Sequence, residues 1–483
     1  MTDQYDWSQI ETPLKPFDHQ YDMIRHVLSR DSGAIYAEMG TGKTKAMIDA
    51  YRLRSQREDL VMLVLCPKSV IHSWTSDLKA NDVTNFVVVD ANLTKKRKHE
   101  AFRNMARSGK GVIIMNYEQI LTMIDVPYDL IDWVVLDEGH NIKNPKAKRT
   151  KSIIAHFIDT KYKNIMTGTP IANHPTDVWS QAWFLDPKIF NRINFYAFRN
   201  RYCVMGGFQN KQVVSHKNLP ELKSRIDNFS IQLKKEDCLD LPEKMYIPRV
   251  LEMPKEMKTQ YDSMMHDLIL ELSEEEHLTA EVAATKIMRL SQITSGAFLE
   301  GKNPKLEELS SIIDELIENK RQVVIMYVFT KSGDMIEKMI QEKGLAYSKI
   351  DGSTNDRPDQ IDRFQKKKAK VFMGQVASCG LGVTLTAAST LIYFENDYNL
   401  THRKQSEDRI HRIGQKENCT YIDLCYGGTV DEKVHTAIRK KQDVATYLVD
   451  SFKKGGASFK GTKKKTSETS SDFPERYSSD VGA

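Results

Sequence analysis

The sequence predicts an α/β protein of two lobes, each built on a parallel sheet, with a helical insertion between them and a flexible carboxy-terminal tail. At 483 residues and 55.5 kDa, the chain exceeds the size at which one hydrophobic core stops growing. Short β-rich runs alternate with helix-length segments in two separate blocks, which is typical of buried parallel strands. Between the blocks, apolar residues recur at helical spacing.

The composition is that of a globular protein, with 40% hydrophobic and 28% charged residues. The longest apolar run, Leu60–Cys66, is far shorter than the roughly 20 residues that cross a bilayer, and the polar start through Glu11 has no signal-peptide core. We therefore expect a soluble protein that is not secreted and has no membrane partner. The six cysteines form no Cys-x-x-Cys pair, which favours a reducing compartment over a disulfide framework or a zinc site. The net charge of +5 is too small to identify a polyanionic partner.

Ten buried strands are expected from runs of apolar and β-branched residues. Those of the first block are Ala34–Ala37, Leu60–Cys66, Phe86–Val89, Val112–Met115, Trp133–Leu136 and Asn164–Met166. Those of the second block are Val323–Phe329, Val371–Met373, Leu391–Phe394 and Tyr421–Leu424.

Helices separate the two blocks. Tyr261, Met264 and Leu268 recur at helical spacing, and a further helix is expected to begin at Pro304, since proline suits the first turn. The tail is rich in Lys, Ser, Thr and Gly and has too few apolar side chains to form a core. The expected domains are an amino-terminal lobe at 1–235, a linker and insertion at 236–303, a carboxy-terminal lobe at 304–450 and a disordered basic tail at 451–483.

A phosphate-binding loop is predicted directly after the first strand, where Ala37–Thr44 leads into a helix. Met39, Gly40, Thr41 and Gly42 let backbone N–H groups close around a phosphate at the positive end of that helix. Lys43 supplies a charge to the β and γ oxygens, and the Thr44 hydroxyl suits Mg²⁺. The alternative is a glycine turn with an incidental lysine.

Two adjacent carboxylates end the strand Trp133–Leu136. Asp137 is suited to hold Mg²⁺, and Glu138 to orient and deprotonate the water that attacks the γ-phosphate. The alternative is a solvated strand end. His140 lacks a second His or Cys at ligand spacing, so a hydrogen-bonding role is favoured over a metal site.

Arg409 and Arg412 lie three residues apart within Gln405–Gln415. On a helix this spacing points both side chains the same way, and we expect them to act as arginine fingers on a nucleotide held by the other lobe. An isolated arginine pair on a helix is usually surface charge.

These blocks resemble the Swi/Snf-type DNA-dependent ATPases of helicase superfamily two, over about Leu14 to Leu448. The compact chain resembles a bacterial or phage-like member. The matching segments are Leu14–Gln20, Ala37–Thr44, Leu65–Trp74, Asn116–Glu118, Asp137–Asn144, Thr167–Asn173, Phe184–Pro187, Ile350–Thr354, Gly380–Leu385 and Gln405–Gln415.

The resemblance implies two RecA-like lobes that bind ATP and Mg²⁺ in a cleft while duplex DNA lies across both. It implies that Gln20 reads adenine and that Gly380 and Gly382 sense the ligands, while Arg409 and Arg412 complete the site. The residues that would couple nucleotide state to DNA are Gly168, Thr169, Pro170, Gln405 and Asp408.

Contacts with DNA are a weaker inference, because the residue types that position phosphates are common in loops. The candidates occupy family motifs at strand ends: Lys68, Ser69, Asn116, Thr330, Lys331, Gly352 and Ser353. No base-reading module is recognisable, so binding is expected to be largely sequence-independent and sensitive to salt.

The sequence favours an ATP-driven translocase on double-stranded or branched DNA that remodels DNA or protein–DNA complexes. A strand-separating or branch-migrating helicase is the first alternative, and a catalytically inactive DNA-binding scaffold is the second. The expected location is the cytoplasm of a bacterial or phage-infected cell, or the nucleus if the source is eukaryotic.

Overall fold

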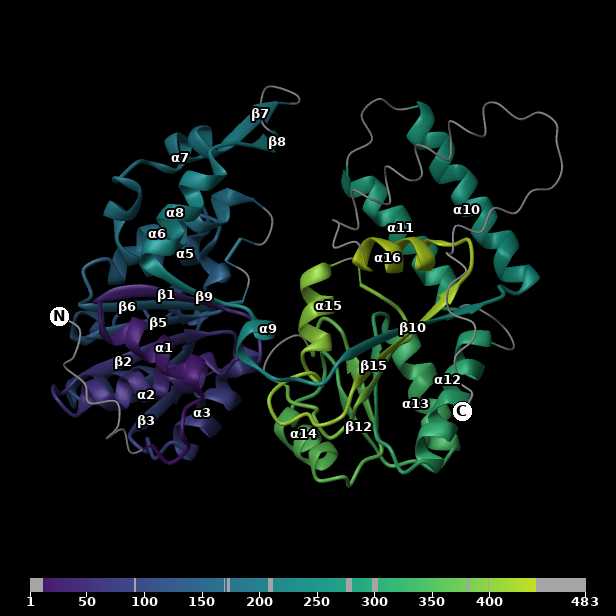
Figure 1. Ribbon diagram of the computed structural model, residues 1–483, viewed down its shortest axis with the longest axis horizontal. Helices are drawn as coiled ribbons and strands as arrows, with labels where there is room; N and C mark the ends of the chain where they lie inside the picture. The colour runs from purple at the N-terminus through teal and green to yellow at the C-terminus, as the bar shows by residue number, and fades with distance from the viewer. Residues whose placement is uncertain are drawn as a thin grey trace. The chain divides into compact units, whose positions relative to one another are not determined.

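Two sheets with parallel strand pairing form the framework of the protein, as the alternating pattern predicts (Figure 1). The computed structural model describes residues 12–90, 93–168, 170–171, 174–206, 212–274, 280–297, 303–379, 383–397 and 399–439. The chain divides into two units: the first extends to Arg249 and includes Lys305–Leu424, and the second holds Val250–Pro304 and the chain from Cys425 on. The predicted α/β class is confirmed, while the tail from residue 451 lies outside the described residues.

The amino-terminal lobe of the first unit is built on a seven-stranded sheet in the order β3-β4-β2-β5-β6-β1-β9. Its strands are β1 (Ser32–Ala37), β2 (Val61–Cys66), β3 (Phe86–Val89), β4 (Gly111–Asn116), β5 (Trp133–Asp137), β6 (Tyr162–Thr167) and β9 (Ser230–Leu233). The first six were predicted. The edge strand β9 was not, because its short Ser-Ile-Gln-Leu sequence carries little apolar signal.

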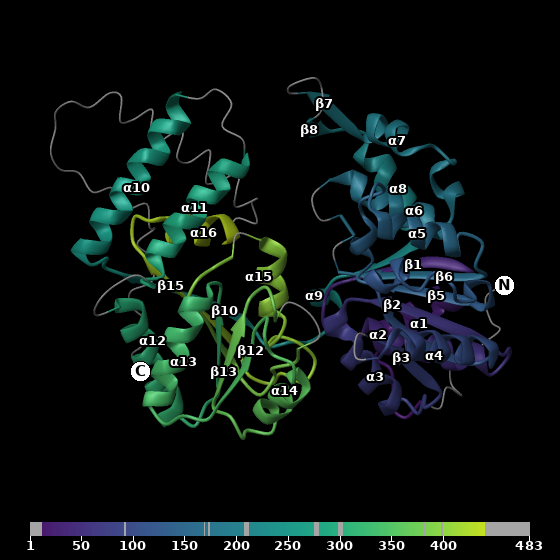
Figure 2. The ribbon, with the colours of Figure 1, turned by 180° about the vertical axis from the view of Figure 1, so that it is seen from behind.

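Helices cover both faces of this sheet. Ile35 and Ala37 of β1 are buried on the side of α1 (Asp18–Leu28), α2 (Lys43–Ser55) and α3 (Ile71–Ala80). Ala34 and Tyr36 are buried on the opposite face, since successive strand residues alternate. That face packs against α4 (Lys95–Arg107), α5 (Lys148–Phe157), α6 (Trp179–Leu185), α7 (Phe195–Tyr202) and α8 (Leu219–Phe229). The two layers are visible in Figure 2, with α2 and α3 on one side of the strands and α5 and α6 on the other.

Shorter elements complete this lobe. An antiparallel hairpin pairs β7 (Cys203–Gly206) with β8 (Gln212–His216). Single turns of 3-10 helix lie at Lys68–Val70, Tyr117–Leu121, Tyr128–Leu130, Gly139–Ile142, Pro175–Val178 and Pro187–Phe190.

The carboxy-terminal lobe is built on a six-stranded sheet in the order β10-β15-β14-β11-β13-β12. Its strands are β10 (Lys244–Leu251), β11 (Val323–Tyr327), β12 (Tyr347–Ile350), β13 (Val371–Gln375), β14 (Thr390–Tyr393) and β15 (Cys419–Tyr426). The accompanying helices are α12 (Pro304–Glu318), α13 (Thr330–Glu342), α14 (Arg357–Gln365) and α15 (Leu400–Glu407). The predicted start of α12 at Pro304 is confirmed. The edge strands β10 and β12 were missed, because β10 contains Pro248 and β12 is half polar, features that only an edge position tolerates.

The second unit contains the predicted helical insertion as α10 (Lys255–Glu274) and α11 (Ala280–Thr294), together with α16 (Val430–Arg439) from the far end of the chain. The Val430 N–H donates to the Tyr261 hydroxyl at 2.7 Å, and the Thr294 hydroxyl donates to Asp431 at 2.6 Å. These bonds join the insertion to α16. Within the described ranges, no helix is both long and apolar enough to span a bilayer.

Candidate active site

The loop between β1 and α2 has the conformation that its glycines predict. Gly40 and Gly42 have φ angles of 81° and 79°, in the left-handed region that favours glycine. A Cβ atom on Gly42 would lie 2.1 Å from Gln20 Nε2, so any other residue would displace the Gln20 amide as well as strain the backbone. Lys43 Nζ donates to the carbonyls of Ala37 at 2.7 Å and Glu38 at 3.1 Å, which places the ammonium group against the loop. Burial lowers the pKa of Lys43, and the charges of Glu138 and Asp137 oppose that shift.

Helix α1 is fastened to this loop by two side chains. His19 Nε2 lies 2.8 Å from the Thr41 carbonyl oxygen, and Gln20 Nε2 donates to the Gly42 carbonyl at 3.4 Å. Gln20 Oε1 also accepts from the Phe17 N–H at 2.9 Å. The sequence predicts a role for Gln20 but not for His19. His19 contacts the loop only because the folded loop lies against α1.

The carboxylates at the end of β5 have different partners. Asp137 Oδ2 accepts from Trp74 Nε1 at 2.7 Å. Glu138 has a φ of 54°, which is unusual for a residue with a side chain, and Oε2 of Glu138 accepts from the Thr167 hydroxyl at 3.2 Å. His140 Nδ1 lies 3.3 Å from Glu138 Oε2 and 3.2 Å from Thr167 Oγ1, so the predicted hydrogen-bonding role of His140 is confirmed.

These environments shift the pKa values of Asp137 and Glu138 in opposite directions. Burial and the neighbouring charge of Glu138 raise the pKa of Asp137. Burial alone would raise the pKa of Glu138 as well, but the hydrogen bond from His140 and the charge of Lys43 outweigh burial and lower it. Glu138 is therefore the more acidic of the two carboxyl groups.

The prediction that Arg409 and Arg412 lie on a helix is wrong. Helix α15 ends at Glu407, and both arginines lie in the turns that follow. The Gln405 carbonyl, which a longer helix would pair with the Arg409 N–H, accepts from Arg409 Nε at 2.9 Å, and the Arg409 N–H donates to the Ser406 carbonyl at 3.1 Å, the tighter spacing of a turn.

Both arginines are nevertheless directed inward. Arg409 is 4% exposed, and its guanidinium donates to the Val383 carbonyl at 3.2 Å and to Met39 Sδ of the phosphate loop at 3.7 Å. Arg412 Nη1 donates to Thr384 Oγ1 at 2.9 Å. Burial and the adjacent charge of Arg412 lower the pKa of Arg409 to about 10. An anion beside this pair would relieve the repulsion between them.

One cavity of about 470 Å³ brings together most of the residues predicted to bind or hydrolyse ATP. The predicted residues on its wall are Gln20, Met39, Gly40, Gly42, Lys43, Thr44, Asp137, Glu138, Asp408, Arg409 and Arg412. The wall also includes Leu14, Lys15, Phe17, Lys45, Val70, Ser73, Asp77 and Ile413. Ser73 and Asp77 are four residues apart on α3. This spacing predicts that they share one face of the helix, but it does not predict that this face lines the cavity.

Other predicted site residues lie beside the cavity wall or beyond it. Thr41 is buried, and its hydroxyl donates to the Glu38 carbonyl at 2.8 Å. Gly168 lies against the phosphate loop, since a Cβ there would be 3.5 Å from the Ala37 carbonyl oxygen and from the Met39 nitrogen. The Pro170 carbonyl accepts from Gln181 at 2.8 Å. Thr169, Gly380 and Gly382 lie outside the described residues.

The candidate DNA contacts occupy the carboxyl ends of strands. Lys68 and Ser69 follow β2, and Asn116 ends β4, the strand paired with β2. In the other lobe, Thr330 and Lys331 begin α13 after β11, and Gly352 and Ser353 follow β12. All are exposed or half-buried, and none lines the cavity.

The fold and the site define a two-lobed RecA-like protein of helicase superfamily two. The SNF2-related domain model matches residues 19–298, and the helicase conserved C-terminal domain model matches residues 304–414. The chain belongs to the SNF2-related family, which confirms the resemblance that the motifs indicated.

Curated relatives show the same likeness. The chain is 25% identical over 459 residues to the chromatin structure-remodeling complex subunit snf21 of Schizosaccharomyces pombe, an alignment that covers 87% of this chain and 38% of that protein. It is 26% identical over 437 residues to an uncharacterized ATP-dependent helicase of Mycoplasma genitalium, covering 87% of this chain and 40% of that one. It thus spans less than half of either relative. The Sulfolobus solfataricus SWI2/SNF2 ATPase core in complex with dsDNA is 23% identical, with a TM-score of 0.43 and coverage of 91% of this chain and 95% of that one.

Replacing Gly42 tests the loop geometry. Gly42→Ala is expected to weaken ATP binding by about 10-fold or more, because the new Cβ combines left-handed strain with a clash against Gln20. The measurement is titration with a fluorescent ATP analogue. Gly109→Ala is the matched control, since Gly109 has a φ of 72° but no atom within 4 Å of the added Cβ. Equal affinity in the two variants would contradict the clash.

Proposed function

We propose that this protein is an ATP-hydrolysing, DNA-stimulated motor that translocates on double-stranded DNA and remodels DNA or protein–DNA complexes. The observation that carries the proposal is the single cavity lined by Lys43, Asp137, Glu138, Arg409 and Arg412. Family membership adds support, as do relatives described as ATP-dependent helicases and as subunits of a chromatin structure-remodeling complex.

The residues of the cavity divide the work of ATP hydrolysis. The loop at 39–44 cradles the phosphates, and Lys43 neutralises their charge. Glu138, held by Thr167 and His140, orients the attacking water and accepts its proton. Arg409 and Arg412 stabilise the negative charge that develops on the transferred phosphoryl group. Gln20 reads the adenine ring, and Gly380 and Gly382 complete the nucleotide site.

Mg²⁺ fits the donors that the cavity offers. Thr44 and Asp137 both line it, and a hydroxyl and a carboxylate oxygen are ligands that Mg²⁺ accepts alongside phosphate oxygens and water. When bound, the ion would neutralise phosphate charge, and its positive charge would oppose the raised pKa of Asp137.

The remaining assignments extend the same proposal to the whole chain. Residues 1–235 and 304–450 are the two ATPase lobes, 236–303 the linker and insertion, and 451–483 a basic tail. Gly168, Thr169, Pro170, Gln405 and Asp408 couple the nucleotide to DNA. The DNA contacts are Lys68, Ser69, Asn116, Thr330, Lys331, Gly352 and Ser353. The protein acts in the cytoplasm of a bacterial or phage-infected cell, or in the nucleus of a eukaryote.

Substrate dependence tests the proposal. ATPase rates are compared without polymer and with single-stranded DNA, duplex DNA, branched DNA and RNA, alongside triplex-displacement and strand-separation assays. Duplex DNA is expected to stimulate hydrolysis, and triplex displacement is expected without strand separation. Added salt should weaken the stimulation steeply, because phosphate contacts release counterions. Stimulation by RNA alone would contradict the proposal that DNA is the substrate. Strand separation without triplex displacement would identify a helicase.

Removing the proposed general base tests the chemistry. Glu138→Gln is expected to bind ATP normally while hydrolysis falls by about 10²- to 10⁴-fold, the range for loss of one proton-transfer group. Single-turnover hydrolysis and nucleotide titration separate these effects. Glu100→Gln, on the exposed surface of α4, should leave both unchanged. Wild-type hydrolysis by the Glu138 variant would assign the base elsewhere.

Removing an arginine tests whether the carboxy-terminal lobe takes part in the reaction. Arg412→Ala is expected to lower kcat by about 10³-fold or more with little change in ATP affinity, because the charge acts chiefly in the transition state. Steady-state kinetics with saturating duplex DNA provides the measurement, and the exposed Arg107→Ala is the control. An unchanged kcat would show that Arg412 takes no part in the reaction.

A further inference from the structure

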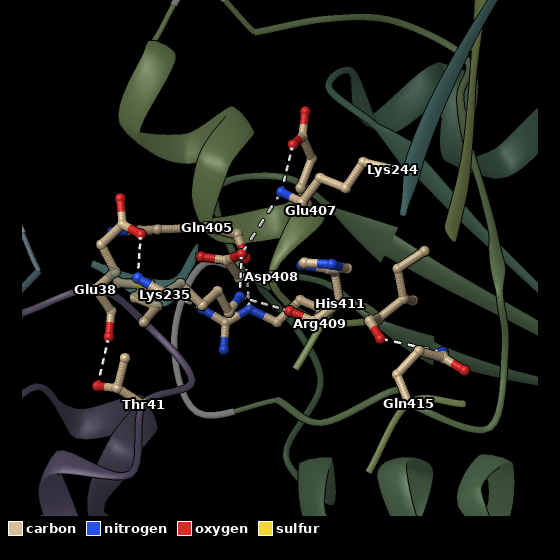
Figure 3. A network of polar contacts seen from close by, with 12 residues as sticks. Glu38, Thr41, Lys235, Lys244, Gln405, Glu407, Asp408, Arg409, His411 and Gln415 are labelled. Atoms are coloured by element: carbon tan, nitrogen blue, oxygen red, sulfur yellow. Dashed lines mark hydrogen bonds and ion pairs between the residues drawn. The ribbon is translucent and has the colours of Figure 1, made fainter. Parts of the chain in front are cut away.

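A buried lysine contacts both the phosphate loop and the segment Asp408–Arg412, called here the arginine segment. Lys235 is the first residue of α9 (Lys235–Cys238), in the connection from β9 to β10. It is 7% exposed, whereas the side chain of the preceding Lys234 is 68% exposed and pairs with Glu236 at 3.4 Å. Figure 3 shows Lys235 between Glu38 on one side and Asp408 on the other. Of these two adjacent lysines, Lys235 is therefore the buried one.

The backbone of Lys235 is attached to the phosphate loop. Its N–H donates to Glu38 Oε2 at 2.9 Å, and the Glu38 N–H donates to the Leu233 carbonyl at 3.1 Å. The Glu38 carbonyl in turn accepts from the Thr41 hydroxyl and from Lys43 Nζ. A shift of the loop at Glu38 would therefore move the start of α9.

The side chain of Lys235 is attached to the arginine segment. Its Nζ lies 2.6 Å from Asp408 Oδ1 and donates to the His411 carbonyl at 2.5 Å. These two residues flank Arg409 and precede Arg412. A Cβ atom on Gly40 would lie 3.1 Å from Arg412 Cβ and 3.3 Å from Lys235 Cε, so loop, lysine and arginine are in direct contact.

Neighbouring contacts fix the arginine segment from the same connection. Lys244 Nζ lies 3.1 Å from Glu407 Oε2 and 3.8 Å from Asp408 Oδ1, and His411 Nε2 lies 2.8 Å from the Pro242 carbonyl oxygen. The Lys235–Asp408 pair differs from these contacts because Lys235 alone also binds the phosphate loop. A buried ion pair contributes little more to stability than apolar residues of similar size would. Stability alone therefore does not explain the position of the Lys235–Asp408 pair.

We propose that Lys235 is a positioning residue that ties the phosphate-binding loop to the arginine segment, so that the placement of Arg409 and Arg412 follows the conformation of the loop. This inference rests on the proposed ATPase function and adds a residue to it. Lys235 does not itself line the cavity. It transmits the loop conformation through Glu38 at its backbone and through Asp408 and His411 at its side chain.

Kinetics on a matched set of variants tests this role: Lys235→Met, Asp408→Asn, the double variant and the control Lys234→Met. Lys235→Met is expected to lower the DNA-stimulated kcat by about 10- to 100-fold, the effect of a small misplacement of catalytic groups, with the KM for ATP changed less than about 3-fold. The control should match the wild type.

The double variant separates positioning from stability. Asp408→Asn leaves the buried Lys235 without its carboxylate partner, and Lys235→Met leaves Asp408 with only the more distant Lys244, so each single variant should show a lower Tm. The double variant should recover Tm but keep the low kcat, and its loss of kcat should equal that of one single variant, because the pair acts as a unit. Recovery of kcat together with Tm would overturn the proposal, and so would additive losses.

Hydrogen exchange tests the same link without any activity. In the nucleotide-free protein, Lys235→Met should speed amide exchange at both 38–42 and 408–412, while Lys234→Met should not. Faster exchange at only one of the two segments would overturn the link. If the wild type lacks DNA-stimulated hydrolysis but the exchange result holds, the proposed function fails and the link stands.

Discussion

The structure depends on the compensation of charge that is buried around one cavity. Lys43, Asp137, Glu138 and Arg409 are each less than a tenth exposed, and charges removed from water require partners to offset the lost solvation. The partners are the carbonyl of Ala37 at the end of β1 for Lys43, Trp74 of α3 for Asp137, and the carbonyls of Gln405 on α15 and of Val383 for Arg409. Regular elements therefore hold the charged side chains that the loops present.

The sheet order of the amino-terminal lobe explains how the phosphate loop and the acidic pair meet. Strands β1 and β5 are not neighbours, because β6 lies between them. The end of β6 contacts both: Thr167 donates to Glu138, and Gly168 lies against Ala37 and Met39. Parallel strands bring their carboxyl ends to the same edge, so residues from distant parts of the chain share one site.

Contacts on α15 and contacts from the connection between β9 and β10 hold the arginine segment in place. Before it, Arg403 on α15 is buried against Asp423, with its Nη1 at 2.5 Å from Oδ1, and its Nε lies 2.9 Å from Glu407 Oε1. Glu407 also accepts from Lys244 and Tyr246 of β10. Beyond the helix, Lys235 and Pro242 contact Asp408 and His411. The segment thus has few ways to move without disturbing the connection between the lobes.

The sequence by itself determined the α/β class, the helical insertion and the strands that are apolar throughout, and it singled out Lys43, Asp137, Glu138 and the two arginines, which line one cavity. These follow from local periodicity and from residue types that phosphate chemistry requires within a few positions. Only the tertiary structure decided that α15 stops at Glu407, after which the buried Arg409 guanidinium reaches the Val383 carbonyl and Met39 Sδ. It also decided the places of His19, Asp77 and Lys235, and the edge strands β9, β10 and β12. Their partners lie far away in the sequence, and no local pattern encodes a contact of that kind.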